Sequence, residues 1–108
     1  MEGKISSDLI RGHTDTIVLG ILRDGDSYGY DIYKRILAKS KGLYELKEAT
    51  LYSSFRRLEK EGYISSYWGD ESQGGRRKYY KLNAAGETLY KRNKTDWEFT
   101  KNMIDQLI

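Results

Sequence analysis

The chain has 108 residues, 32% of them charged, and a formal net charge of +3. This length allows one domain with a single modest core and excludes two, and the lack of cysteine excludes disulfide bonds and thiolate metal sites. The positive excess lies in residues 47–81, which hold eight basic and five acidic side chains, while both flanking segments are balanced. A charge excess confined to one segment indicates a polyanionic partner.

Two amphipathic helices are predicted in the N-terminal part. The first begins after Ser6 or Ser7, has apolar side chains at four-residue spacing, and ends at an Asp-Gly-Asp turn. The second starts at Ser27 and closes near Gly42. Gly29 removes a side chain from its first turn, most simply to let a neighbouring backbone approach.

A third helix is predicted over 48–61, ending at the natural C-terminal cap Gly62. Its buried side comprises Leu51, Phe55 and Leu58. The opposite side has small residues near its start, which let a helix approach base edges, and arginines behind them, which can reach phosphate or guanine. The DNA contacts expected from this region are Lys47, Ala49, Thr50, Tyr52, Ser53, Arg56 and Arg57.

A β-hairpin follows, with strands Ile64–Trp68 and Arg77–Leu82 and a polar loop that ends in two glycines. Basic residues directly after two glycines are what an arm needs to track a phosphate backbone or minor groove. The expected contacts here are Gly75, Arg76, Arg77 and Lys78. Trp68 is expected to pack the hairpin against the body.

Asn83 is expected to cap a last helix that runs to the C-terminus. Residues at alternating spacings of three and four form a seam typical of a helix packed lengthwise on another: Tyr90, Asn93, Trp97, Thr100, Ile104 and Leu107. A small domain cannot bury so long a helix on both sides, so we expect a homodimer. The predicted fold class is mainly α with a small β-hairpin, a winged helix-turn-helix in residues 1–82 followed by a C-terminal dimerisation helix in 83–108.

Three strings carry a resemblance to a known family: SYGYDIYKRI at 27–36, ATLYSSFRRLEKEGYI at 49–64 and GGRRKYYKLNAAG at 74–86. In this order they resemble the signature segments of PadR-family transcriptional regulators. The single helix after the hairpin resembles the short subfamily, and the hairpin sequence with a lone tryptophan in the last helix is similar to its multidrug-responsive members. The resemblance implies a dimeric repressor with the third helix in the major groove, the hairpin wing alongside, and the first and last helices forming the dimer.

Two features depart from the family pattern. Many members begin the third helix with a Ser or Pro-Gly cap, whereas here Leu46-Lys47-Glu48 stands at that place, which leaves open which residues meet bases first. Asp70 and Glu71 precede the basic arm and would repel phosphate. Only the arm from Gly74 to Lys78 is therefore expected to touch DNA.

Trp97 has two interpretations, which the sequence leaves open. Tryptophan at a helical seam is usually an interface anchor. The resemblance to drug-responsive relatives implies instead that the Trp97 side chains of two subunits sandwich a planar hydrophobic ligand between them. The expected walls of this pore are Leu9, Asp15, Thr16, Asn93, Lys101 and Ile104.

Other function classes have little support. The N-terminus is mixed polar and no apolar run reaches the length of a membrane span, so we expect a cytoplasmic protein without membrane association. No nucleophile–base pairing and no carboxylate cluster with ligand-like spacing occurs, so we expect no enzymatic activity, metal or cofactor. The single histidine, His13, lies on the apolar stripe of the first helix and is expected to be a hydrogen-bonded core or interface residue.

We therefore expect a PadR-like transcriptional repressor that binds a pseudo-palindromic double-stranded DNA operator as a homodimer and is relieved by a planar hydrophobic ligand near Trp97. The alternative is a winged-helix adaptor that binds protein or RNA, which the acidic residues before the arm and the small net charge favour. A third possibility is a protein that only sequesters hydrophobic compounds. Sequence-selective binding of duplex DNA at physiological salt distinguishes the first from the others.

Overall fold

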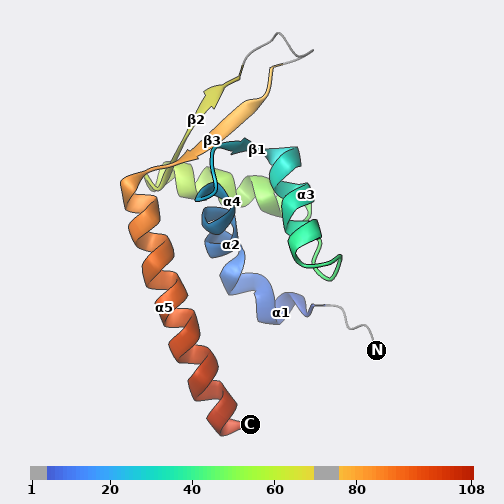
Figure 1. Cartoon of the computed structure of the whole chain (residues 1–108), viewed down its shortest axis with the longest axis vertical. Helices are drawn as coiled ribbons and strands as arrows, with labels where there is room; N and C mark the ends of the chain where they lie inside the picture. Colours follow the sequence, from blue (N-terminus) through green and yellow to red (C-terminus); the bar gives the residue numbers. More distant parts are fainter. Residues whose placement is uncertain (1–4, 70–75) are drawn as a thin grey trace.

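Figure 1 shows the computed structural model, which describes residues 5–69 and 76–108. The elements in chain order are α1 (Ser7–Ile10), the 3-10 turn η1 (Arg11–His13), α2 (Thr14–Leu22), β1 (Ser27–Tyr28), α3 (Gly29–Lys39), α4 (Glu48–Lys60), β2 (Ile64–Trp68), β3 (Lys78–Leu82) and α5 (Ala84–Leu107). Helices α2, α3 and α4 pack with a small sheet into a head, the β2–β3 hairpin, or wing, projects from it, and α5 runs away on the opposite side. The predicted fold class is confirmed.

The first helix is interrupted, whereas the sequence predicts a continuous one. η1 separates α1 from α2, which begins only at Thr14. α1 and η1 bury no residue, while α2 buries Val18, Leu19 and Leu22 among others. Short helices depend on packing for their stability, and Gly12 within η1 favours a helical backbone less than other residues. The regular helix is therefore confined to the segment that meets the core.

β1 is an element that sequence analysis missed. Ser27 and Tyr28 pair antiparallel with Tyr80 and Tyr79 of β3, so the sheet has three strands in the order β1-β3-β2. Two residues are too few to show the alternation that identifies a strand. The following helix α3 consequently starts two residues later than predicted.

The wing has the predicted antiparallel strands, in a register that pairs Ser66 with Tyr80 and Trp68 with Lys78. Tyr80 is buried on the face that covers α4. The expectation that Trp68 packs the wing against the body is wrong, because its side chain is 57% exposed. Its pair with Lys78 lies further out along the hairpin than the pair that contains Tyr80, beyond the part that reaches the core.

α4 turns its apolar side to the core as predicted. The side chains on this face are at most 1% exposed and comprise Leu51, Phe55 and Leu58. Phe55 stacks on Tyr80 with ring centroids 4.0 Å apart, which fixes the sheet on α4. Gly62 has a φ of +85°, and the Tyr63 N–H donates to the Leu58 carbonyl at 2.9 Å. These are the features of a glycine C-terminal cap, so that prediction is confirmed.

The start of α5 is fixed tightly to the head. The Asn83 side chain accepts a hydrogen bond from the Gly86 N–H at 2.9 Å, which confirms the predicted cap. A Cβ on Gly86 would lie 2.2 Å from the Tyr63 carbonyl oxygen, so only glycine allows this approach. The far end of α5 instead exposes apolar side chains such as Phe99 and Leu107. No helix in the described residues is long and apolar enough to cross a membrane.

Candidate nucleic-acid interface and adjoining grooves

The outer side of α4 carries the small and basic side chains that sequence analysis assigned to DNA contact. Most of these side chains are exposed, and Ser53 is partly buried; the exposed ones are Lys47, Ala49, Thr50, Tyr52, Arg56 and Arg57. Arg56 Nη2 donates to Ser53 Oγ at 3.2 Å and so lies along the helix surface. Lys47 provides no side-chain cap, as the sequence indicated.

Tyr52 connects α4 to the start of α3. A Cβ on Gly29 would lie 2.5 Å from the Tyr52 hydroxyl oxygen, so the missing side chain of Gly29 makes room for this tyrosine. The expectation that a backbone approaches Gly29 is wrong, since the neighbour is a side chain. The Tyr52 ring also meets Phe55 edge to face, with centroids 5.5 Å apart. Tyr52 therefore packs α4 closely against the start of α3.

Arg57 is held by a carboxylate on α2. Its Nε and Nη2 donate to the two carboxylate oxygens of Asp15 at 2.8 and 2.5 Å, and Ser54 Oγ donates to Asp15 Oδ1 at 2.7 Å. Burial raises the pKa of the Asp15 carboxyl, but the hydrogen bonds from Arg57 and Ser54 and the charge of Arg57 outweigh it and hold this pKa below its ordinary value. The carboxylate is therefore ionised at neutral pH.

Aromatic rings hold the two arginines of the wing on opposite faces of the hairpin. The Arg76 guanidinium lies 5.0 Å from the Trp68 ring centroid, and the Arg77 guanidinium lies 4.8 Å from that of Tyr28. Trp68 shares a face with its partner Lys78, and Tyr28 shares the other face with its partner Tyr79. The face that carries Trp68 also carries Tyr80, which packs against Phe55 of α4. The predicted contact Gly75 and the acidic Asp70 and Glu71 lie outside the described residues.

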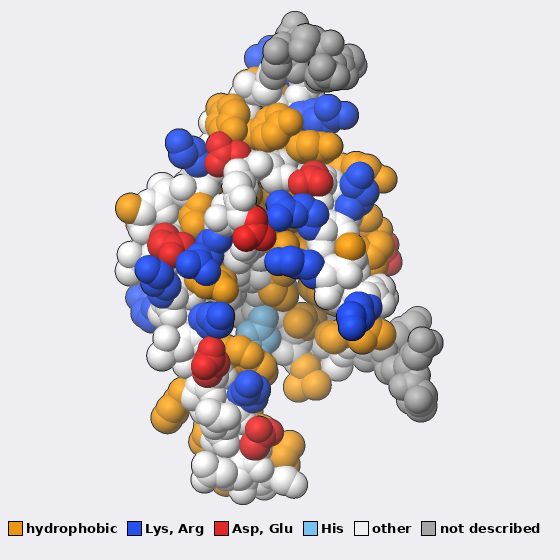
Figure 2. All heavy atoms as spheres, in the orientation of Figure 1, with side chains coloured by type: hydrophobic (Ala, Val, Ile, Leu, Met, Phe, Trp, Pro, Cys, Tyr) orange, Lys and Arg blue, Asp and Glu red, His pale blue; other side chains and the backbone are white. Residues whose placement is uncertain are grey.

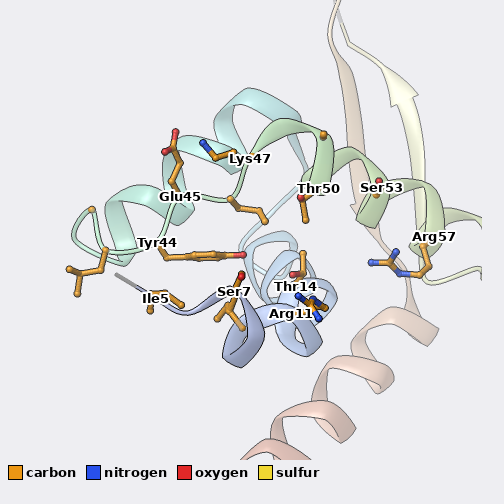
Figure 3. A pocket seen from close by; sticks show the side chains of 15 residues that line it. Ile5, Ser7, Arg11, Thr14, Tyr44, Glu45, Lys47, Thr50, Ser53 and Arg57 are labelled. Atoms are coloured by element: carbon orange, nitrogen blue, oxygen red, sulfur yellow. The ribbon is translucent and has the colours of Figure 1, made fainter. Parts of the chain in front are cut away.

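A broad groove of about 830 Å³ lies between α1 and the start of α4 (Figure 3). Lys47, Thr50, Ser53 and Arg57 line it from the α4 side, and Arg11 faces them from η1. The charges around the groove are largely balanced, because Arg11 donates to Asp8 at 3.0 Å, Arg57 donates to Asp15, and Glu45 also lines the groove. The polar side of α4 thus continues into this groove.

A second groove, the Trp97 groove, lies between α5 and the segment from α1 to α2 and has a volume of about 520 Å³. It brings together most of the residues expected around a ligand: Leu9, Thr16, Asn93, Trp97, Lys101 and Ile104. Asn93 Nδ2 donates to Thr16 Oγ1 at 2.9 Å and ties α5 to α2. Asp15 does not line this groove, because its side chain points to Arg57 on the other side of α2.

The Trp97 groove also includes residues that the sequence did not predict as its walls: Gly12, Asp96, Thr100, Asp105 and His13. Of these, His13 contacts the Trp97 ring. Its ring meets the Trp97 ring edge to face, with centroids 4.7 Å apart. A further groove of about 540 Å³ lies on the other side of Trp97. It has four lining residues in common with the Trp97 groove: Leu9, His13, Thr16 and Trp97. The position of His13 on the same stripe as Leu9 was the available signal. Trp97 thus stands between two grooves with one aromatic neighbour already in place.

Charge is distributed unevenly along the molecule. On the face shown in Figure 2, blue basic side chains gather over the head with red carboxylates among them, and few lie on the far half of α5. Within the described residues, no group of three or more His, Asp or Glu side chains could hold a metal ion. The candidate site is therefore a basic binding surface next to two partly apolar grooves.

Comparison with known proteins identifies the family. The transcriptional regulator PadR-like family matches residues 18–92. A transcriptional regulator from Clostridium thermocellum is similar in structure, with a TM-score of 0.90 and 52% identity over 96% of this chain and 98% of that one. A PadR family transcription regulator from Clostridium difficile R20291 follows with 0.77 and 37% over 89% and 98%. Bacillus subtilis PadR, solved in complex with operator DNA, has 0.64 and 25% over 77% of this chain and 45% of that one. The chain belongs to the PadR-like family, a family of transcriptional regulators and not of enzymes.

Proposed function

We propose that the protein is a transcriptional repressor that contacts operator DNA through the outer side of α4 and the arm of the wing. The observation that supports this most strongly is that α4 turns small and basic side chains outward beside a wing whose arginines are pre-oriented on aromatic rings. Small residues allow close approach to base edges, and arginines donate to phosphate or guanine. The related Bacillus subtilis PadR was solved in complex with operator DNA.

The proposed active form is a homodimer that uses α5, assisted by the segment from α1 to α2. Large apolar side chains along the far half of α5 are between 41% and 74% exposed: Trp97, Phe99, Met103, Ile104 and Leu107. A continuous apolar surface on a helix favours burial against a second copy. A two-fold axis would place two α4 helices about one helical turn apart, roughly 34–36 Å, which is why the operator would be pseudo-palindromic.

The proposed inducer is a planar hydrophobic ligand bound between the subunits at the Trp97 groove. Trp97 is 43% exposed and lies between two grooves that are partly apolar, so its ring can stack on a flat compound. The ligand would bind more tightly to the subunit arrangement that cannot bind DNA than to the one that can. This difference in affinity sets how far the ligand can lower operator occupancy.

DNA binding is tested by fluorescence anisotropy with a duplex from the gene's own promoter and a scrambled duplex, at two salt concentrations. The wild type is expected to prefer the promoter duplex. Ser53→Glu places a negative charge on the outer side of α4 and should abolish this preference, whereas Thr95→Glu, on the exposed side of α5, should retain it. Equal affinity of the wild type for both duplexes at physiological salt would contradict the repressor assignment and favour the adaptor alternative.

Ligand binding is tested in a Trp68→Phe variant, in which Trp97 is the only remaining tryptophan. A neutral planar aromatic dye, such as a coumarin, should quench Trp97 fluorescence and release the promoter duplex over the same concentration range. Quenching without release of DNA would mean that the protein binds such compounds without using them to control the operator.

A further inference from the structure

Asp15 and Thr16 lie next to each other on α2 but serve different parts of the molecule. Thr16 accepts a hydrogen bond from Asn93 on the side of the Trp97 groove. Asp15 accepts hydrogen bonds from Arg57 and Ser54 of α4. Ser54 is completely buried, so its hydroxyl fixes the carboxylate in one position. A single turn of α2 thus determines where the Arg57 side chain lies.

The pairing leaves one edge of the Arg57 guanidinium turned away from Asp15. Both hydrogen bonds use the edge formed by Nε and Nη2, so Nη1 is on the far side of the planar group. The Arg57 side chain is 48% exposed, and it borders the groove between α1 and α4 next to Ser53. An ordered guanidinium with an accessible edge suits one acceptor at a defined place better than it suits any nearby phosphate.

We infer that Asp15 is a positioning residue for operator recognition: it orients Arg57 towards one acceptor on the operator and, by neutralising the arginine, weakens binding to other DNA. This inference rests on the proposed function. An unpaired arginine adds to the attraction for every phosphate backbone, whatever the sequence. Ordering a long side chain on binding lowers affinity by a factor of about 2 to 10, and a side chain that Asp15 already orders avoids most of this loss.

The test is the ratio of affinities for promoter and scrambled duplexes, measured by anisotropy for the wild type and Asp15→Asn. The substitution keeps the shape of the side chain and removes its charge. We expect the affinity for scrambled DNA to rise and the ratio to fall about tenfold, because two subunits each lose one oriented arginine. In an Arg57→Gln background, Asp15→Asn should leave the ratio unchanged, since its effect passes through Arg57.

Glu87→Gln is the matched control. It breaks another two-bond pair, in which Arg23 donates to Glu87 at 2.7 and 2.9 Å, and it changes the net charge equally without touching α4. This variant should leave the ratio unchanged. If Asp15→Asn changes both affinities by one common factor, as a simple gain of charge would, the inference is overturned.

Two further outcomes separate the inference from folding and from the proposed function. If circular dichroism shows that Asp15→Asn does not fold, Arg57→Gln alone decides: a lower ratio supports the inference and an unchanged ratio overturns it. If the wild type itself binds both duplexes equally, the proposed function fails, and the inference fails with it.

Discussion

The wing arm offers the most direct test of how the protein holds a phosphate backbone. Replacing Arg76 and Arg77 together by alanine should weaken binding to every duplex and flatten its dependence on salt, because these side chains would contact phosphate and not bases. The Trp68 and Tyr28 rings hold the Arg76 and Arg77 guanidiniums, respectively, on opposite faces of the hairpin. We therefore expect one arginine of each wing, and not both, to reach phosphate.

The magnitude follows from the number of phosphate contacts that are lost. Each contact contributes about 0.9 to the slope of log affinity against log salt, so a dimer that loses one contact per wing should lose about 1.8 of slope. Between about 50 and 200 mM salt, the affinity of the wild type should then fall roughly twelvefold more than that of the variant. Anisotropy titrations across this salt range measure both quantities.

The control is Lys91→Ala with Arg92→Ala, a neighbouring basic pair in the middle of α5 that removes the same charge away from the head. Its salt slope should match the wild type. An unchanged affinity and slope in the Arg76 and Arg77 double variant would refute any role of the wing in DNA binding. A decrease of about 3.6 in the salt slope would show that both arginines of each wing contact phosphate, and would refute the expectation that the Trp68 and Tyr28 rings allow only one contact per wing.

Three further predictions concern the grooves and the stability of the head. Trp97→Ala should weaken binding of a planar aromatic dye about tenfold or more while sedimentation still shows a dimer; dissociation of the dimer would show that Trp97 is an interface anchor. Gly86→Ala should lower the free energy of unfolding by about 1–3 kcal/mol in urea denaturation, because its Cβ meets the Tyr63 carbonyl oxygen, whereas Gly12→Ala, with nothing within 4 Å, should not. Folding lowers the pKa of Asp15, so the ionised carboxylate stabilises the fold at pH values above the ordinary pKa of an aspartate, and this contribution is lost as the pH falls through the lowered pKa. The difference in melting temperature between wild type and Asp15→Asn should therefore shrink on acidification. A constant difference down to pH 3 would contradict this.

Sequence reasoning succeeded where one local signal was strong. The spacing of Leu51, Phe55 and Leu58 gave the buried side of α4, and a glycine with positive φ marked its end. The Asn83 cap and the alternating strand Ile64–Trp68 were equally local. Such features depend on residues a few positions apart, which is the range over which periodicity and capping act.

Sequence reasoning failed where the answer depends on contacts between distant segments. β1 exists because Tyr28 meets Tyr79 across the sheet, and a two-residue strand has no pattern of its own. Asp15 was expected to be a wall of the ligand pore, yet its side chain points to Arg57, which lies far along the chain. The exposure of Trp68 likewise follows from how far the hairpin extends beyond the core.

If two copies of this chain bind one operator through α4 and the wing, duplexes selected from a random pool at physiological salt should reveal that operator. Native mass spectrometry of the selected complexes then gives the number of chains per duplex. We expect an enriched pseudo-palindrome with half-site centres about one helical turn apart, in complexes of two chains per duplex. No enriched sequence, or a single asymmetric site bound by one chain, would contradict a repressor that acts as a homodimer.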